Sequence, residues 1–409
     1  FKIDVDDADF LKQDLKIVLS TKRLLKLLGE VDKVQADATY KLVWQGYPVL
    51  IVGTSDICRK FHPLAVAVCF GEAEADFAFI FQAMKQSYMN IHQMIWKPNV
   101  LLADASVAIT NGFKSVFGTP ARRLQCFFHV LKNVDSVIRG ITEKTEIGRD
   151  LHALQLCIDD EVFIIAENLF LKKWESKNVT NHQAIKDFIN YFKKTWLGIN
   201  RFWYEGACAR FPSTNNGLES INATIKKEHT LRERLPVGQF MEALRTSLVE
   251  KWSYERNPEN PNYKPFFSTI KLTTKLWTDA YQWVKLKPKM FEEKSNEKTI
   301  YYTKSTNATE VLNQEEMQTW KNTYLKWECF DDFRKSQTVL KLACYSENEE
   351  LVSQCTCSRF LKEYICEHSL GLLVILGKAK VPIEAKSVPL GQKRKRGRPT
   401  TAKKALIIQ

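Results

Sequence analysis

Three acidic residues lie at positions from which a fold of strands and helices could bring their carboxylates together. Asp37 lies in a strand-like segment, between two alanines that leave room for a ligand. Asp104 directly follows the apolar segment 100–103 and precedes a helix-like segment. Because α/β folds place ligands at strand ends, we expect the Asp104 carboxylate to face a crevice. Glu219 lies on the polar stripe of a segment with helical spacing, so it can lean toward a sheet.

Carboxylates grouped in this way have a specific chemical use. Two divalent ions about 3.5–4 Å apart promote cleavage of phosphodiester bonds, and Mg²⁺ and Mn²⁺ prefer oxygen ligands. Each acid taken singly is more often an ordinary surface or capping residue. The three together, on two strands and one helix, predict a catalytic site in which Asp37, Asp104 and Glu219 bind two Mg²⁺ or Mn²⁺ ions.

The segments around the first two acids predict a mixed sheet. Short stretches rich in β-branched residues predict strands at 34–42, 48–55, 64–70, 99–104 and 122–129. A helix is predicted over 72–88, where apolar residues repeat with helical spacing, and another after Ser106. The first three strands are joined by short turns and should be antiparallel, whereas helical crossovers imply parallel additions. With the acid positions, this order favours a ribonuclease H-like fold over other α/β domains.

Beyond residue 131 the apolar spacing is mainly helical. The range 131–210 carries many aromatic residues, the helix that holds Glu219 is predicted over 216–228, and further helices over 237–284. The polar range 285–313 predicts a long loop, and a helix is predicted again at 315–329. A small strand-rich unit with clustered cysteines follows.

A Cys-x-x-His pair, Cys126 and His129, lies between the second and third acids. Two residues cannot complete a structural zinc site, which usually takes four ligands. On a single strand, residues three apart would point to opposite faces of the sheet. We consider two roles for His129 equally: a catalytic one, contacting the scissile phosphate or orienting a carboxylate, and a structural one in packing.

A second metal signature lies near the C-terminus, with the spacing Cys-x-Cys-x8-Cys-x-His formed by Cys355, Cys357, Cys366 and His368. Three thiolates and one imidazole make a closed tetrahedral site, so we predict one structural Zn²⁺. The other cysteines among the ten are scattered through the chain. That distribution is typical of a reducing compartment and not of a disulfide framework.

The positive charge is concentrated at the C-terminal end. The net charge is +13, and the range 391–409 contributes seven basic residues and no acids. This excess favours a polyanionic partner such as DNA. The tail contains Arg-Gly-Arg-Pro, whose Arg396 and Arg398 resemble an AT-hook that enters the minor groove, and such basic runs also direct nuclear import. No stretch reaches about 18 apolar residues, so we expect no membrane partner.

The segments that carry the three acids, Asp37-Ala-Thr-Tyr, Leu101-Leu-Ala-Asp-Ala-Ser and Asn215-Asn-Gly-Leu-Glu-Ser-Ile-Asn, resemble the motifs of Mutator-like transposases. The Cys-x-x-His pair is similar to a signature of that family. The C-terminal cluster resembles the SWIM zinc finger that often follows the transposase domain. The resemblance covers about residues 1–380 and implies a ribonuclease H-like fold interrupted by a helical insertion. It also implies a homo-oligomer assembled on paired DNA ends.

These observations predict the following domains: a ribonuclease H-like catalytic domain at 1–139 and 211–240, a helical insertion at 140–210, a helical region at 241–338, a SWIM-like zinc finger at 339–380, and a basic disordered tail at 381–409. By charge and position alone, Arg201, Lys226 and Lys227 are candidates for phosphate contacts. The basic tail predicts nuclear localisation.

The functional expectation is a DNA transposase of the DDE type, which cleaves at transposon ends and joins the 3′-hydroxyl to target DNA. The main alternative is a transposase-derived DNA-binding regulator of transcription that no longer cleaves. A third alternative is a ribonuclease H-type nuclease acting on RNA–DNA hybrids, and the finger-like unit and long insertion argue against it. The presence of all three acids favours the enzyme.

Overall fold

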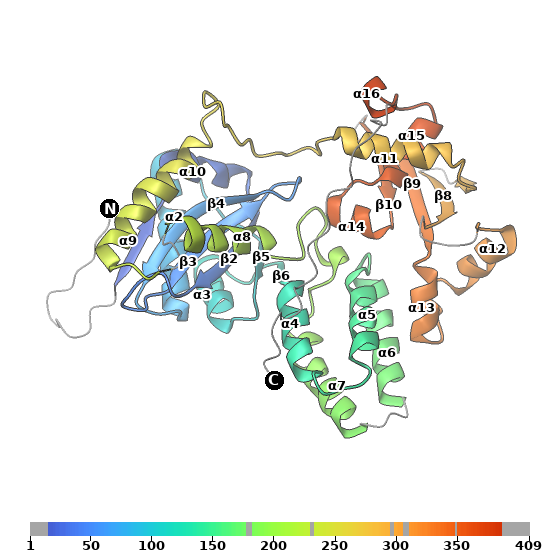
Figure 1. Cartoon of the computed structure of the whole chain (residues 1–409), viewed down its shortest axis with the longest axis horizontal. Coiled ribbons are helices and arrows are strands. Elements are labelled where there is room, and N and C mark those ends of the chain that lie inside the picture. Colours follow the sequence, from blue (N-terminus) through green and yellow to red (C-terminus); the bar gives the residue numbers. More distant parts are fainter. Residues whose placement is uncertain are drawn as a thin grey trace, which may run out of the picture.

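The computed structural model describes residues 15–176, 182–229, 233–294, 298–305, 311–347 and 350–386. The Arg-Gly-Arg-Pro motif, with Arg396 and Arg398, lies outside these residues. Figure 1 shows three parts: a sheet with helices on both sides, a group of helices from α4 to α7, and a C-terminal module from α11 onward. An extended segment joins α10 to α11 across the top of this view.

A mixed sheet forms the first part, and its strands are β1 (Lys16–Leu19), β2 (Lys33–Thr39), β3 (Val49–Ser55), β4 (Phe61–Cys69), β5 (Val100–Ala103) and β6 (Arg122–Gln125). The spatial order is β1-β4-β3-β2-β5-β6. The first four strands in this order pair antiparallel, and β5 and β6 are added in parallel. This is the strand order of a ribonuclease H-like fold, as the sequence predicted.

The two faces of the sheet have separate cores because successive side chains of a strand point to opposite faces. On one face, Leu50 and Val52 pack with the helices α2 (Glu74–His92) and α3 (Val107–Phe117). On the other face, Val49 and Ile51 pack with α8 (Asn216–Thr224) and with the elements after it. The apolar stripe predicted for α2 is confirmed, since its residues are buried: Phe77, Ile80, Phe81, Met84 and Tyr88.

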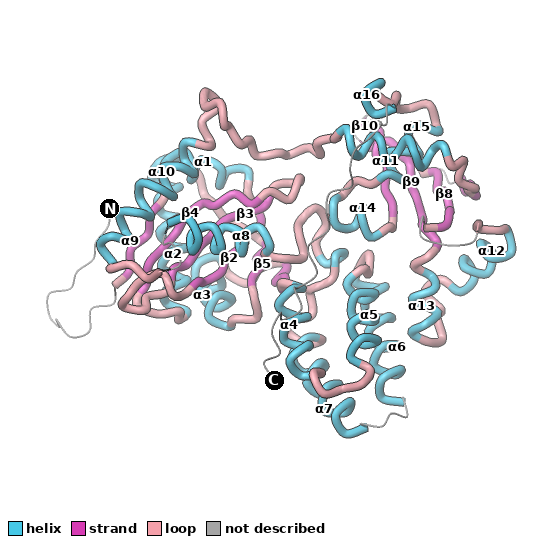
Figure 2. Tube along the Cα trace, viewed as in Figure 1, coloured by secondary structure: helices cyan, strands magenta, loops and turns pink. Residues whose placement is uncertain are grey.

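Short helices complete the two faces of the sheet. They are α1 (Lys22–Lys26), the 3-10 turn η1 (Leu27–Glu30), the π-helical turn η3 (Ile225–His229), α9 (Val237–Ala243), the π-helical turn η4 (Leu244–Val249) and α10 (Glu250–Tyr254). The turn η3 continues α8, and η4 joins α9 to α10 into one rod. Figure 2 shows the helices α9 and α10 of this rod beside the sheet, and their apolar residues pack on the same face as α8.

The contact between α2 and α3 leaves no space at Gly112. A Cβ atom there would lie 2.6 Å from Phe77 Cβ and 2.8 Å from the Ala78 backbone nitrogen. We therefore expect Gly112→Ala to lower the free energy of unfolding by about 1–3 kcal/mol, because the backbones must move apart. Gly148→Ala is the matched control in a helix, since its Cβ would meet no atom within 4 Å.

The control should gain roughly 0.5–1 kcal/mol, because alanine loses less backbone entropy than glycine in a helix. Urea unfolding of both variants measures the difference. Equal stability of the two variants would show that the α2–α3 contact is loose.

Four helices form the second part: α4 (Phe127–Val137), α5 (Lys144–Gln155), α6 (Asp160–Ser176) and α7 (His182–Trp196). A short 3-10 turn, η2 (Glu205–Ala207), follows. Their aromatic residues form one large core, which also includes Trp327, Phe330 and Phe333 from much later in the chain. At its edge, fully buried Asp150 accepts hydrogen bonds from Lys173 (2.8 Å) and Trp174 (3.1 Å), and lies 3.3 Å from Arg334.

The strand predicted over 122–129 was wrong in its second half. β6 ends at Gln125, Cys126 caps the next helix, and α4 begins at Phe127. Phe127, Val130 and Val134 are buried and repeat at helical spacing. This pattern favours a helix over a strand from Phe127 onward.

The third part is a sheet in the order β10-β9-β8-β7. Its elements are α11 (Thr274–Lys285), β7 (Phe291–Lys294), β8 (Thr299–Lys304), α12 (Gln314–Thr323), α13 (Phe330–Ser336), β9 (Val339–Glu347), β10 (Glu350–Cys355), α14 (Ser358–Glu363), α15 (Glu367–Ile375) and α16 (Ile383–Lys386). All of its neighbouring strands pair antiparallel.

Two expectations for this region differ from the structure. The range 285–313, predicted as a loop within a helical region, contains β7 and β8. All residues of β8 pair with β9, and Tyr301 and Tyr302 are buried. The basic tail was expected from residue 381, yet α16 lies in its first residues and buries Ala385. The strands β7 and β8 and the helix α16 are short and are flanked by polar residues, so the sequence shows no clear strand or helix pattern there.

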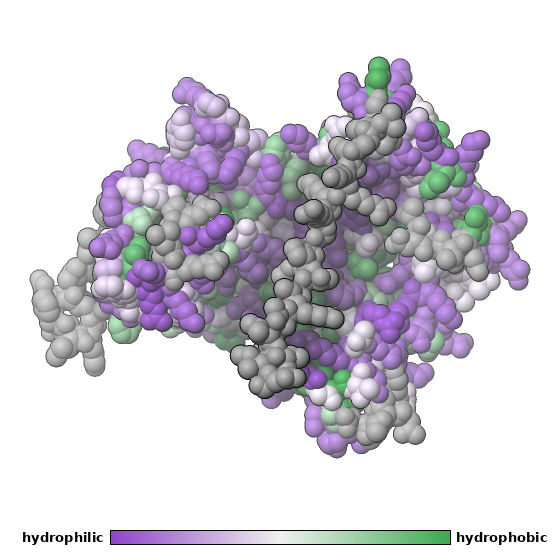
Figure 3. Space-filling model, viewed as in Figure 1, coloured by the Kyte–Doolittle hydropathy of each residue, from purple (hydrophilic) through white to green (hydrophobic). Residues whose placement is uncertain are grey.

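The surface in Figure 3 is mainly hydrophilic, and its hydrophobic residues form scattered patches. Within the described ranges, no helix has both the length and the apolar character needed to cross a bilayer.

Candidate active site and metal centre

The register of the sheet brings Asp37 and Asp104 to the same level. In the parallel pair of β2 and β5, Gln35 lies opposite Leu102. Two residues further along each strand are Asp37 and Asp104, the latter directly after the end of β5. The site is therefore at the strand end that the sequence predicted.

The Asp37 side chain points to the face of the sheet that α8 covers. Glu219 lies on α8 and therefore on the same side of the sheet. Asp37 pairs with Ile51, whose side chain belongs to the core beneath α8, and cross-strand partners share a face. Gly217 allows α8 to approach closely, since a Cβ there would lie 2.6 Å from Phe61 Cβ. From the next turn of α8, the Asn222 amide donates a hydrogen bond to Asp37 Oδ2 at 3.2 Å.

The charges of Asp104 and Glu219 both act on Asp37, so the three carboxylates belong to one electrostatic group. Burial, the charge of Asp104 and, to a smaller extent, the charge of Glu219 together raise the pKa of Asp37 to about 7, while a backbone N–H at Ala38 opposes the shift. In addition, Glu219 Oε1 is buried and accepts no hydrogen bond from the described residues. The oxygen donors of the three acids fit divalent ions such as Mg²⁺ or Mn²⁺, whose charge would offset the repulsion among the carboxylates.

A fourth carboxylate, Glu72, belongs to this electrostatic group and was missed in the sequence. It lies between β4 and α2 and is partly buried. Burial raises its pKa, and the charge of Asp104 raises it further; Glu72 in turn raises the pKa of Asp37. Its place directly after the end of a predicted strand is the signal that could have identified it.

Arg123 fixes the segment that carries Asp104, and it too was missed. Its guanidinium is buried and donates to the backbone oxygen of Asp104 at 2.5 Å and to Thr110 Oγ1 at 2.8 Å. Burial lowers the pKa of Arg123 to about 10, and the charge of Asp104 opposes that shift. Asp104 Oδ1 also accepts the Ser106 backbone N–H at 3.0 Å, which leads the chain into α3.

The Cys-x-x-His pair lies beside Glu219. Because Cys126 caps α4 and His129 is in its first turn, the two side chains lie on one side and not on opposite faces of a strand. His129 Nε2 lies 3.8 Å from Glu219 Oε1. The Cys126 sulfur accepts the Asn215 backbone N–H at 3.3 Å, at the start of α8. The pair thus links α4 to the helix that carries the third acid.

The three internal candidates for phosphate contacts occupy different surroundings. Arg201 lies 3.2 Å from Glu167 Oε1 and 5.8 Å from the centre of the Phe163 ring. Lys226 and Lys227 lie in η3, directly after α8, and Lys227 is exposed. Two of the three candidates therefore follow the helix of Glu219, while Arg201 lies against the helical insertion.

The C-terminal cysteines and histidine form one buried cluster. The ligand atoms of Cys355, Cys357, Cys366 and His368 all lie within 4.8 Å of one another. Cys355 ends β10, Cys357 caps α14, Cys366 caps α15, and His368 lies in the first turn of α15. This Cys3His set has the donors and number that structural Zn²⁺ requires.

Backbone N–H groups surround the sulfur atoms of this cluster. Cys357, Phe360 and Ser369 donate to the three sulfurs at 3.3–3.4 Å, which stabilises thiolates. Hydrogen bonds from the Cys355 and Cys366 thiols lower the pKa of Cys357, whereas burial raises the pKa of Cys355 and Cys366. Without a metal one thiolate is favoured at most, so metal binding must displace protons.

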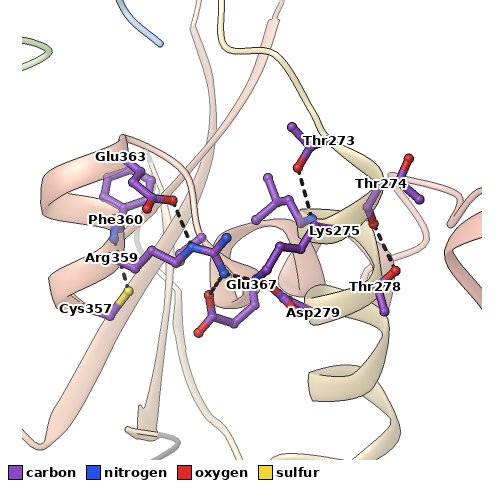
Figure 4. Close-up of polar contacts among 12 residues, drawn as sticks. Thr273, Thr274, Lys275, Thr278, Asp279, Cys357, Arg359, Phe360, Glu363 and Glu367 are labelled. Atoms are coloured by element: carbon purple, nitrogen blue, oxygen red, sulfur yellow. Dashed lines mark hydrogen bonds and ion pairs between the residues drawn. The ribbon is translucent and has the colours of Figure 1, made fainter. Parts of the chain in front are cut away.

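An arginine joins the cluster to the rest of the module. Figure 4 shows Arg359 reaching from α14 to Asp279 on α11 and to Glu367 on α15, at 2.9 and 3.0 Å, with Glu363 also at 3.0 Å. These contacts hold α14, α11 and α15 together around the cysteines.

Comparison with known families identifies the first part of the chain. Residues 33–133 match the MULE transposase domain, which is of the DDE type. A comparison with curated proteins gave no match. The matched segment contains Asp37, Glu72, Asp104 and His129, and it ends before Glu219. The chain thus carries a transposase-family domain, which implies DNA binding.

Proposed function

We propose that this chain is a DNA transposase that cleaves DNA at transposon ends and transfers the resulting 3′-hydroxyl into target DNA. The observation that supports this most strongly is the convergence of Asp37, Asp104 and Glu219. Two of these acids lie within the MULE transposase domain, and the third comes from a helix about 115 residues later. Both reaction steps replace one P–O bond by another: water attacks first and releases a 3′-hydroxyl, which then attacks a target phosphate.

The carboxylates of Asp37, Asp104 and Glu219 would hold two Mg²⁺ or Mn²⁺ ions. Such ions, when bound, activate the attacking oxygen and stabilise the leaving one. The other residues position these carboxylates. Asn222 orients Asp37, and Arg123 fixes the backbone of Asp104. His129 is placed to contact Glu219 or the scissile phosphate.

Asp104→Asn should reduce metal-dependent cleavage and strand transfer to the level seen without Mg²⁺ or Mn²⁺, because it removes one ligand charge while keeping the side-chain shape. The assay uses duplexes that carry candidate terminal repeats. DNA binding, measured by gel shift, should change little. Asp32→Asn is the matched control, since Asp32 is an exposed acid just before β2. Cleavage that survives Asp104→Asn would contradict the assignment of the three acids.

The main alternative is a transposase-derived regulator that binds DNA without cleaving it. The presence of all three acids at one site favours the enzyme. If the chain is such a regulator, the wild type should bind the duplexes in the same assay and cleave none of them with Mg²⁺ or with Mn²⁺.

Further properties are proposed with this function. The Cys3His cluster would hold one structural Zn²⁺ in a SWIM-like finger, and the basic residues Lys226, Lys227 and Arg201 would contact phosphates. The basic tail, with Arg396 and Arg398, supports nuclear import and contact with the minor groove. Joining two transposon ends favours a homo-oligomer of this chain.

A further inference from the structure

A thiol, an imidazole and a carboxylate meet at the edge of the proposed active site. The ligand atoms of Cys126, His129 and Glu219 lie within 4.8 Å of one another. Across the part of the chain that the structure describes, the Cys3His cluster is the other group of such ligands this close together. The three residues come from the start of α4 and from α8.

We propose that Cys126, His129 and Glu219 form a second binding site for Zn²⁺, and that zinc bound there inhibits the enzyme by occupying Glu219. Zinc binding itself is independent of the proposed transposase activity, whereas the inhibition rests on it.

The donor set distinguishes zinc from magnesium. Sulfur and imidazole nitrogen are ligands that Zn²⁺ binds tightly, while Mg²⁺ requires oxygen donors and keeps several waters. Three protein ligands leave a fourth tetrahedral position for water. Only Glu219 is common to this site and to the carboxylate site. A zinc ion there would add positive charge and use a carboxylate, and both effects weaken the binding of Mg²⁺ nearby.

Two of the three side chains have a buried polar atom without a hydrogen-bond partner among the described residues. Glu219 Oε1 and His129 Nδ1 are buried and make no hydrogen bond with described residues. Cys126 is buried, and a metal ion that binds its sulfur replaces the thiol proton. The Asn215 N–H that points at its sulfur favours the thiolate once the proton has left.

The elements that carry the ligands are already fixed to each other. The Cys126 N–H donates to Ala103 O at 3.2 Å, next to Asp104, and the Phe127 N–H donates to Ser213 O at 2.9 Å, just before α8. Binding therefore requires only adjustment of side chains, which keeps its entropic cost small. The same contacts explain why the cysteine and the histidine lie beside the third acid.

The first test counts zinc on the full chain. The wild type should bind two equivalents of Zn²⁺ after gel filtration, and Cys126→Ser should bind one. Titration with Co²⁺ should show thiolate-to-metal absorption for both equivalents in the wild type and for one in the variant. Cys69→Ser is the matched control, because Cys69 is also buried but lies outside both ligand clusters. His129→Ala, at a partly exposed side chain, is a second variant that should bind one equivalent.

The second test measures inhibition. Zinc added up to the second equivalent, with Mg²⁺ in excess, should suppress cleavage by the wild type, whereas Cys126→Ser should keep its own zinc-free rate. A single equivalent in the wild type, or two in Cys126→Ser, would overturn the site. Equal inhibition of both proteins would overturn its inhibitory role. A chain that never cleaves DNA would contradict the proposed function but leave the zinc count valid.

Discussion

Cys366→Ser should release the zinc of the Cys3His cluster and unfold the C-terminal module around it. Cys366 is fully buried in a small core with the other two cysteines, Trp283 and Leu342. Because this core contains few apolar side chains, metal binding must supply much of its stability. Structural zinc contributes about 10–16 kcal/mol in finger peptides, and most of that depends on a complete set of ligands.

Zinc content after dialysis should fall by one equivalent in Cys366→Ser, and limited proteolysis should cut between β7 and α15. Cys344→Ser provides the control, since Cys344 is a half-exposed cysteine on β9 outside the cluster. It should keep both the metal and the resistance to proteolysis. A variant at Cys366 that retains its zinc would show that the four residues are not a ligand set.

Asp37→Asn should stabilise the folded chain at pH 8 when Mg²⁺ and Mn²⁺ are absent. The pKa of Asp37 is raised to about 7 in the folded state by burial and by Asp104 and Glu219, against about 3.9 in an unfolded chain. Below pH 4 the carboxyl is protonated in both states and has no effect on stability. As the pH rises to 7, the unfolded state loses its proton first, and the wild type loses stability.

The difference between the two pKa values corresponds to about 4 kcal/mol as an upper limit, at 1.36 kcal/mol per unit. Asparagine does not ionise, so Asp37→Asn does not lose stability in this way as the pH rises. The denaturant midpoints of the wild type and of Asp37→Asn should therefore agree near pH 4 and diverge up to pH 7. Mg²⁺ should stabilise the wild type at pH 8 and leave the variant nearly unchanged. Parallel pH profiles for both proteins would contradict the raised pKa of Asp37. Asp32→Asn, at an exposed acid, should follow the wild type.

The sequence was sufficient for the fold of the first domain because local signals and long-range packing agree there. The apolar stripe of α2 and the acid at the end of β5 are each encoded within a few residues. The convergence of Asp37 with Asp104 follows from strand register. The polar stripe of its helix indicated that Glu219 could lean toward the sheet, and the family resemblance supported that position, because nothing local to α8 determines which part of the sheet it crosses.

Other features depend on contacts that no local pattern encodes. Glu72, between β4 and α2, joins the acidic group through its proximity to Asp104, and Arg123 acts on Asp104 across two parallel strands. Cys126 and His129 were assigned to a strand because β6 precedes them directly. The strand ends at Gln125, four residues before the predicted end, so the two side chains lie on one side of a helix and not on opposite faces of a sheet. A displacement of one helical turn is enough to change a site.

The shared core of the helical insertion has a consequence for how such proteins can be rearranged. Phe330 and Phe333 of α13 pack among the aromatic residues of α4 to α7, and Arg334 reaches the buried Asp150. Segments more than a hundred residues apart thus share one core. A gene fusion that exchanged only the insertion, or only the region after α11, would expose the aromatic residues at which the two segments meet. Grafting between related chains should succeed only when 127–211 and 324–336 are inherited together.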